Sequence, residues 1–158
     1  MDIRTGELSN PHIIKLLQAH HNDMLKHSPL ESVHALDVTK LTKPDITFYS
    51  LWIDNNLAGV GALKVLNTTH GEIKSMRTSS NYLRQGIAAK LLTHIIEQAT
   101  LRGYKKLSLE TGTAKAFLPA QKLYTQFGFK ECEPFGNYEL DPYSLFMSKS
   151  VYTKMTEK

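Results

Sequence analysis

Hydrophobic residues recur at helical spacing in three parts of the chain. Apolar positions three and four residues apart mark Pro11 to His27, residues 88–99 and residues 119–127 as helices with one buried face. Asn10 is a suitable N-cap, because its side chain can accept a hydrogen bond from the first turn and the following proline is tolerated at the first helical position. Glycine follows each of the other two segments, as is common where a helix ends. The pattern therefore predicts three amphipathic helices.

The segments between these helices are rich in β-branched and aromatic residues, which favour strands. Ile46 to Ile53 is apolar on both faces, and Asn55-Asn56 separates it from a second strand over residues 57–66. Asparagine tolerates positive φ, so a tight hairpin is the expected connection. Shorter strands are predicted over residues 71–78, 106–110, 129–132 and 145–152, and a short helical turn over residues 37–41. Antiparallel strands followed by strand–helix–strand–helix–strand predict an α/β (α+β) fold with a mixed, mostly antiparallel sheet.

Length and composition limit the class of protein. A chain of 158 residues fits one domain, here residues 1–158, and a hydrophobic fraction of 41% supplies a sizeable core. With Cys132 as its one cysteine, the chain can form neither an intramolecular disulfide nor a cysteine zinc site, and we expect no metal. No apolar stretch approaches the roughly 18 residues of a membrane span, and the first residues lack an apolar signal segment, so we expect a cytoplasmic protein. The net charge of +4 is spread along the chain without a basic run, so we expect no nucleic-acid partner.

One turn of the chain is a candidate anion site. The strand over residues 71–78 runs through a short loop into a helix that opens with Gly86-Ile87-Ala88. The first turn of a helix carries unpaired backbone N–H groups, and these bind anions together with the helix dipole. Small residues let a phosphate approach the main chain, and Arg77 and Arg84 add positive charge nearby. The spacing fits neither a Walker A loop nor a Gly-x-Gly-x-x-Gly fingerprint, and close helix–sheet packing is the alternative reason for small residues here.

Two further segments follow this turn. Residues 102–110 read Arg-Gly-Tyr-Lys-Lys-Leu-Ser-Leu-Glu, and residues 120–129 contain Ala-x-x-Leu-Tyr-x-x-x-Gly-Phe. Together with the turn, which is similar to the Arg/Gln-x-x-Gly-x-Gly/Ala motif for the acetyl-CoA pyrophosphate, they resemble the GNAT family of N-acetyltransferases. Leu83 departs from the motif, since Arg or Gln is usual there. The resemblance includes a bacterial subgroup of largely uncharacterised members and implies the GNAT fold and acetyl transfer from acetyl-CoA to an amine, without a metal or a covalent enzyme intermediate.

The resemblance also implies roles for individual residues. A backbone N–H on the strand that contributes Met76 and Arg77 would hold the developing oxyanion. Tyr124 is the candidate acid for the departing thiolate, because a phenol with a pKa of about 10 is protonated at neutral pH; a core tyrosine is the alternative. The implied acetyl-CoA-binding residues are Met76, Arg77, Thr78, Arg84, Gln85, Gly86, Ile87, Ala88, Ala89, Ala120 and Tyr124.

An amine acceptor needs a base, since an alkyl ammonium with a pKa near 10.4 is mostly protonated at neutral pH. Glu110, at the end of a strand, is the leading candidate, directly or through a water. Glu72, at the start of the neighbouring strand, is the second candidate. For both glutamates, a solvated carboxylate at a strand end is the alternative interpretation.

The acceptor side of the site is less defined. His34 and Asp37, in the loop after the first helix, are candidates for binding a polar acceptor, with loop caps as the alternative. The remaining histidines show no metal-ligand spacing, and we expect adjacent His20 and His21 on the surface. The expected acceptor is a small-molecule or peptide amine, with no membrane partner, and a homodimer is expected from the resemblance alone. A non-catalytic acyl-CoA-binding regulatory module is the alternative function.

Overall fold

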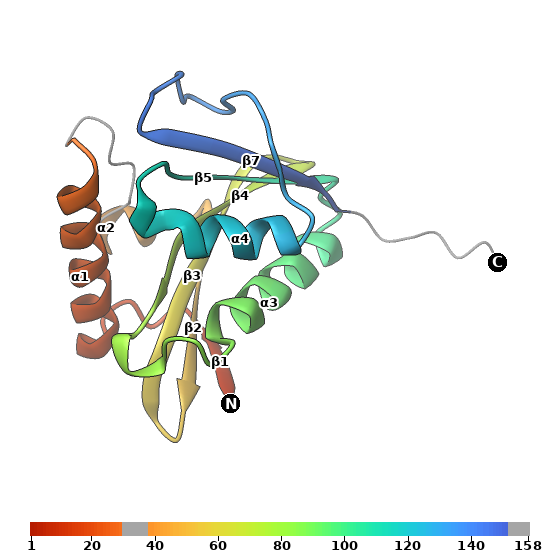
Figure 1. Ribbon diagram of the computed structural model, residues 1–158. Coiled ribbons are helices and arrows are strands. Elements are labelled where there is room, and N and C mark those ends of the chain that lie inside the picture. Colours follow the sequence, from red (N-terminus) through yellow and green to blue (C-terminus); the bar gives the residue numbers. More distant parts are fainter. Residues whose placement is uncertain (30–37, 152–158) are drawn as a thin grey trace.

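The computed structural model describes residues 1–29 and 38–151, which form a seven-stranded sheet with helices on both faces (Figure 1). The strand order is β1-β2-β3-β4-β5-β7-β6; among the described strands, β4 and β5 pair in parallel and all other neighbours are antiparallel. The strands are β1 (Asp2–Thr5), β2 (Ile46–Ile53), β3 (Asn56–Asn67), β4 (His70–Thr78), β5 (Lys106–Gly112), β6 (Lys130–Glu131) and β7 (Ser144–Ser150). The helices are α1 (Pro11–His27), α2 (Val38–Leu41), α3 (Ile87–Leu101) and α4 (Leu118–Gln126), with 3₁₀ turns η2 (Ser80–Tyr82) and η3 (Lys115–Phe117).

Local sequence signals start and connect these elements as expected. The Asn10 side chain accepts a hydrogen bond of 2.9 Å from the His12 N–H and caps α1. Asp54 and Asn55 have φ of +50° and +64°, which allows a tight turn between β2 and β3; the turn lies one residue earlier than the predicted Asn55-Asn56, and Asn56 begins β3. The predicted mixed, mostly antiparallel sheet and its hairpin are confirmed.

Strand β1 was not predicted. It pairs antiparallel with β2, with Ile3 opposite Leu51. Its four residues include a single hydrophobic one, so no alternating pattern can be recognised in them. The partner strand therefore determines its conformation, because β2 offers an edge to which it can bind.

Two hydrophobic layers enclose the sheet, one on each face. Helices α3 and α4 cover one face through residues such as Leu91, Ile95 and Tyr124, and α1 and α2 cover the other through Ile13 and Leu17 of α1 among others. Figure 1 shows α1 on one side of the sheet and α3 and α4 on the other. Alternate residues of β2 enter different layers, which explains why this strand is apolar on both faces.

The sheet divides between its two parallel strands. Pairing of β4 with β5 ends at Ile73 and Leu109; beyond that point β4 pairs with β3 and β5 pairs with β7. An additional residue in β4 interrupts its register with β3 between Lys74 and Arg77, and Ser75 in this bulge has a φ of +58°. Beyond Ile73, the backbone N–H and C=O groups of β4 that point away from β3 therefore have no strand partner among the described residues on the β5 side.

No helix within residues 1–29 and 38–151 is long and apolar enough to cross a bilayer. The same residues contain no group of three or more His, Cys, Asp or Glu side chains suited to hold a metal ion.

Candidate functional site

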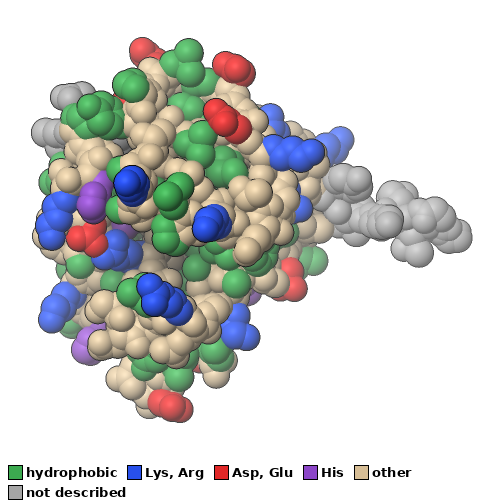
Figure 2. All heavy atoms as spheres, viewed as in Figure 1, with side chains coloured by type: hydrophobic (Ala, Val, Ile, Leu, Met, Phe, Trp, Pro, Cys, Tyr) green, Lys and Arg blue, Asp and Glu red, His purple; other side chains and the backbone are tan. Residues whose placement is uncertain are grey.

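A cavity of about 310 Å³ lies where β4 and β5 separate. Its walls come from α1, from the two strands, from the segment η3–α4 and from the loop before β7. Figure 2 shows a hollowed surface on this face, with basic, acidic and histidine side chains gathered along its α1 side. The residues that line it are His20, Asp23, Met24, His27, Glu72, Ile73, Lys74, Met76, Arg77, Glu110, Thr111, Ala116, Phe117, Ala120, Tyr124 and Tyr138. We call this space the acceptor cavity.

The start of α3 presents a second feature, which we call the amide turn (residues 84–89). Gly86 caps the helix with a φ of +79°, and no atom lies within 4 Å of the position that a side-chain Cβ would occupy there. No side chain caps the helix and its first turn carries no acidic residue. The first helical hydrogen bond runs from the Lys90 N–H to the Gly86 carbonyl, so the preceding N–H groups have no helical acceptor. The amide turn thus offers main-chain donors and the positive end of a helix dipole to an anion.

The two long polar side chains of the amide turn extend into solvent, whereas Ile87 is buried in the core. Arg84 is exposed with a φ of +62°, and Gln85 is exposed with its amide 3.4 Å from the Asn81 carbonyl oxygen. Leu83, which stands where the motif usually has Arg or Gln, is 56% exposed. The donors in this turn are therefore mainly backbone groups.

Tyr124 reaches the acceptor cavity from the inner face of α4. Its ring is buried and packs edge-on against Phe129. Burial raises the pKa of its hydroxyl above the ordinary value of 10, so the phenol keeps its proton throughout the physiological range. Among residues 1–29 and 38–151, no hydrogen-bond partner is found for this hydroxyl. It is a neutral donor directed at a cavity.

Glu110 lies on β5 at the opposite wall, beyond the last residue paired with β4. One of its carboxylate oxygens accepts a hydrogen bond of 2.8 Å from the Ser144 hydroxyl of β7. This bond fixes the orientation of the carboxylate with a neutral partner. Glu110 is thus an oriented proton acceptor on the wall of the acceptor cavity.

Glu72 belongs to a buried three-residue network. Its Oε2 accepts hydrogen bonds from the Tyr138 hydroxyl at 2.6 Å and from the Lys74 ammonium at 3.1 Å. The Lys74 ammonium also donates to the Tyr138 oxygen at 2.8 Å. Burial, followed by the charge and the hydrogen bond of Glu72, raises the pKa of Tyr138, which stays a neutral donor. The network holds Glu72 in place and balances its charge.

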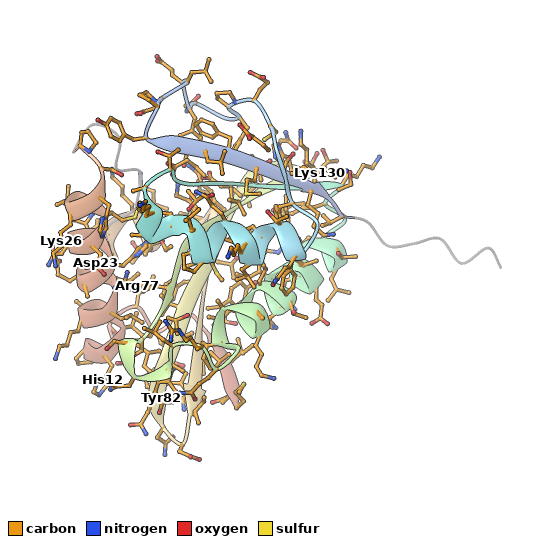
Figure 3. The ribbon with its side chains drawn as sticks, viewed as in Figure 1. His12, Asp23, Lys26, Arg77, Tyr82 and Lys130 are labelled. Atoms are coloured by element: carbon orange, nitrogen blue, oxygen red, sulfur yellow. The ribbon has the colours of Figure 1, made fainter. Side chains whose placement is uncertain are left out.

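The third wall combines α1 with the end of β4. The Arg77 guanidinium donates to the Asp23 carboxylate, and this bond holds the pKa of Asp23 below its ordinary value. Lys26 lies one turn further along α1, with its ammonium 3.8 Å from Asp23. Figure 3 shows Arg77 and Asp23 facing each other between β4 and α1.

His20 completes this wall. Burial, helped by the positive charge of Arg77, lowers its pKa to about 4, so the imidazole is neutral at physiological pH. Its Nδ1 is buried and has no hydrogen-bond partner among the described residues. The expectation of a surface position was wrong for His20 and also for His21, which is half-buried with a buried Nδ1, because the position on a helix gives a direction around the axis but not what covers it.

The acceptor cavity unites several residues singled out from the sequence. Glu72, Glu110, Met76, Arg77, Ala120 and Tyr124 all line it. Thr78, Arg84, Gln85, Gly86, Ile87, Ala88 and Ala89 are not among its lining residues and occupy the end of β4 and the amide turn. His34 and Asp37 lie outside the described residues.

Sequence reasoning missed six polar residues of the cavity: His20, Asp23, His27, Lys74, Thr111 and Tyr138. Lys74 gave a usable signal, since it is two residues from Glu72 and strand geometry places both side chains on one face. Tyr138 gave none, because it reaches Glu72 from 66 residues further along the chain.

Comparison with known proteins agrees with this geometry. The chain matches the acetyltransferase (GNAT) family over residues 12–129. It is 52% identical over 151 residues to the uncharacterized N-acetyltransferase YsnE of Bacillus subtilis, covering 96% of this chain and 100% of that protein. It is 51% identical over 149 residues to the uncharacterized N-acetyltransferase YedL of Escherichia coli, covering 94% of each.

Solved structures share the fold at lower identity. A putative acyl-CoA N-acyltransferase from Klebsiella pneumoniae has a TM-score of 0.77 at 24% identity, covering 95% of this chain and 97% of that chain. An aminoglycoside 6'-N-acetyltransferase complexed with coenzyme A has a TM-score of 0.72 at 14% identity, covering 98% and 99%. The family match and the two relatives above 50% identity support the activity as well as the fold. The chain belongs to the acetyltransferase (GNAT) family and is an N-acetyltransferase that uses acetyl-CoA.

Proposed function

We propose that the amide turn binds the pyrophosphate of acetyl-CoA and that the acceptor cavity directs the acetyl group to a primary amine. The open space at Gly86 and the uncapped start of α3 support the first part, because both suit a phosphate against the main chain. Acetyl-CoA supplies an activated thioester carbonyl. The structural neighbour complexed with coenzyme A supports a shared fold for such binding.

The observation that carries the proposal is that a neutral phenol and an oriented carboxylate face one cavity. Tyr124 lines it from α4 and Glu110 lines it from β5. In the proposed reaction, Glu110 takes a proton from the amine, directly or through a water, and Tyr124 gives a proton to the sulfur that leaves. A backbone N–H of Met76 or Arg77, beyond the point where β4 leaves β5, donates to the carbonyl oxygen.

Between the two glutamates, the contacts of Glu72 count against Glu72 as the base. Glu72 balances the Lys74 ammonium and accepts two hydrogen bonds on one oxygen, so a proton taken there would cost an ion pair in a buried place. Glu110 is oriented by the neutral Ser144 hydroxyl. We therefore propose a positioning role for Glu72, which fixes Lys74 and Tyr138 at the cavity wall.

Release of free CoA in the presence of a panel of primary amines tests this function. We expect acetyl-CoA to bind with measurable heat and CoA release to depend on the amine. Tyr124→Phe and Glu110→Gln should keep the binding heat and lose turnover. Turnover that is intact in both variants would remove the proposed acid and base from their roles.

A further inference from the structure

The ring of Phe117 lines the acceptor cavity and stands where a side chain of residue 112 would otherwise be. Phe117 is the last residue of η3, and Gly112 is the last residue of β5. A Cβ on Gly112 would lie 2.3 Å from two carbons of the Phe117 ring, which is closer than such atoms can approach. Glycine at position 112 therefore lets the ring lie directly against the backbone of β5.

The position of Gly112 relates this ring to Glu110. Both residues belong to β5, which pairs with β7 over this stretch without a register shift. Side chains two residues apart on a strand point to the same face, and the rise of the strand separates them by about 7 Å. The Phe117 ring, in the place of a side chain at position 112, therefore lies on the same side of β5 as the Glu110 carboxylate.

Two further contacts hold the ring between β5 and α1. The His27 ring, at the end of α1, meets the Phe117 ring edge to face, with ring centroids 6.0 Å apart and ring planes at 80°. The side-chain amide of Gln121 on α4 donates a hydrogen bond of 2.8 Å to the Gly112 carbonyl oxygen, which connects the start of α4 to the end of β5. Figure 1 shows the start of α4 beside α1. The ring thus bounds the acceptor cavity between these two walls.

We propose that Phe117 determines acceptor specificity by limiting the substituent of the amine to a short apolar chain. The inference rests on the proposed function and names its substrate class. With the amine nitrogen at Glu110, the space for its substituent is bounded by the Phe117 ring about 7 Å further along the strand. A branched or two-ring substituent collides with this ring, whereas a short unbranched chain lies against it.

The size and lining of the cavity agree with such an acceptor. At about 310 Å³ the cavity is at the small end of the roughly 300–1,000 Å³ typical of ligand sites, and under the proposed function it also admits the acetyl end of the co-substrate. Ala116 and Ala120 line it from the same segment as Phe117, and Met24 lines it from α1. These side chains are apolar, so an alkyl chain can be buried against them without leaving a polar group unpaired.

Phe117→Ala tests the size limit. Propylamine, 2-phenylethylamine and 2-(1-naphthyl)ethylamine each carry one primary amine and differ in the bulk of its substituent. For the wild type we expect kcat/KM to fall in that order. Phe117→Ala should raise the kcat/KM of the naphthyl amine relative to that of propylamine at least tenfold, measured as CoA release from acetyl-CoA. An equal ratio in wild type and variant overturns the proposal, as does turnover of none of the three amines by either enzyme.

Gly112→Ala tests the contact between the ring and the strand. Gly112 has no positive φ, and the three atoms nearest to its Cβ position all belong to Phe117, so the ring is the obstacle to alanine there. We expect Gly112→Ala to lower kcat/KM for propylamine about tenfold, because the added carbon displaces the ring. The double variant Gly112→Ala/Phe117→Ala should match Phe117→Ala alone. An unchanged kcat/KM in Gly112→Ala, or a loss that persists in the double variant, would contradict this contact.

Leu118→Ala is the matched control, because Leu118 follows Phe117, is 46% exposed and is not among the lining residues of the cavity. It should leave the preference among the three amines unchanged, and a shift as large as that of Phe117→Ala would contradict a specific role for the ring. The series acetyl-, propionyl- and butyryl-CoA is measured with propylamine as well. If Phe117→Ala changes the preference among these thioesters and not among the amines, the ring bounds the acyl group and the proposal is wrong.

Binding of acetyl-CoA separates failure of this inference from failure of the proposed function. If acetyl-CoA binds and Glu110→Gln loses turnover of propylamine while Phe117→Ala keeps the wild-type preference, the function stands and the role of Phe117 is wrong. If acetyl-CoA gives no binding heat, the proposed function is wrong as well.

Discussion

The amide turn and the acceptor cavity lie at successive parts of the same strand–helix segment, yet they are built differently. The amide turn offers main-chain N–H groups of consecutive residues, with the side chains of Arg84 and Gln85 in solvent. The acceptor cavity is lined by side chains from α1, β4, β5, α4 and the loop before β7. A backbone site suits the constant part of a reaction, and a side-chain site suits the part that determines specificity. Under the proposed function, co-substrate binding and acceptor chemistry therefore belong to different regions, and substitutions can separate them.

The largest effect is expected for Glu110→Gln. Loss of a general base lowers kcat by about 10²- to 10⁴-fold, while the amide turn and its affinity for acetyl-CoA stay unchanged. Steady-state CoA release and calorimetric titration measure the two quantities on one preparation. Glu131→Gln, an exposed carboxylate on β6, is the matched control and should retain activity. A wild-type kcat in the Glu110→Gln variant would contradict the assignment of Glu110 as the base.

Tyr124→Phe comes next. The phenylalanine ring keeps the contact with Phe129 but removes the proton donor, so we expect kcat to fall about 10²-fold without a change in the Kd for acetyl-CoA. Tyr104→Phe replaces another buried tyrosine, one that lies outside the cavity lining, and serves as the comparison. Equal losses in both variants would point to packing in place of proton donation.

The low pKa of His20, which lines the cavity, makes the stability of the fold depend on pH. Its pKa is about 4 in the folded chain and 6.5 in the unfolded one, so between these values the unfolded state binds more protons and stability falls as the pH is lowered. From this residue alone we expect a loss of about 2 kcal/mol between pH 7 and pH 5. Urea unfolding of the wild type and of His20→Asn at both pH values measures it. The variant should lose less stability on acidification; an identical loss would contradict the buried neutral imidazole.

Tyr138→Phe should have a smaller effect. It removes one donor from the buried Glu72 carboxylate and keeps the Lys74 contact, so we expect a loss of about 1–3 kcal/mol in the free energy of unfolding. Urea denaturation measures this loss, and Tyr143→Phe, a half-exposed tyrosine of the same loop, should change stability by much less. Wild-type stability in Tyr138→Phe would show that the network does not hold Glu72.

The contrast between the two regions also explains what the sequence could predict. Consecutive residues with a recurring backbone geometry leave a local signal, as at Gly86, which has positive φ at the start of α3, and at Asn55 in the β2–β3 hairpin. The three long helices followed from spacing in the same way, whereas β1 and the order of the strands in the sheet did not. Tyr124 and Glu110 were found through family motifs, and the structure brings them to one cavity.

Residues that meet across the fold left no such signal. Asp23 and Arg77 come from α1 and β4, 54 residues apart, and neither position has a pattern that anticipates the other. Tyr138 reaches Glu72 from a loop without regular structure. The acceptor side of the site therefore had to come from the structure, because its specificity depends on how distant elements pack.

Titration of acetyl-CoA into matched glycine variants tests most directly whether the amide turn binds the co-substrate. Gly86 and Gly103 are at opposite ends of α3, both with positive φ and with open space where a Cβ would stand. Alanine at either position carries a similar backbone strain of about 1–2 kcal/mol. We predict that Gly86→Ala weakens acetyl-CoA binding at least tenfold whereas Gly103→Ala binds as tightly as the wild type. Equal affinity in both variants would contradict the proposal that main-chain groups at the start of α3 bind the pyrophosphate.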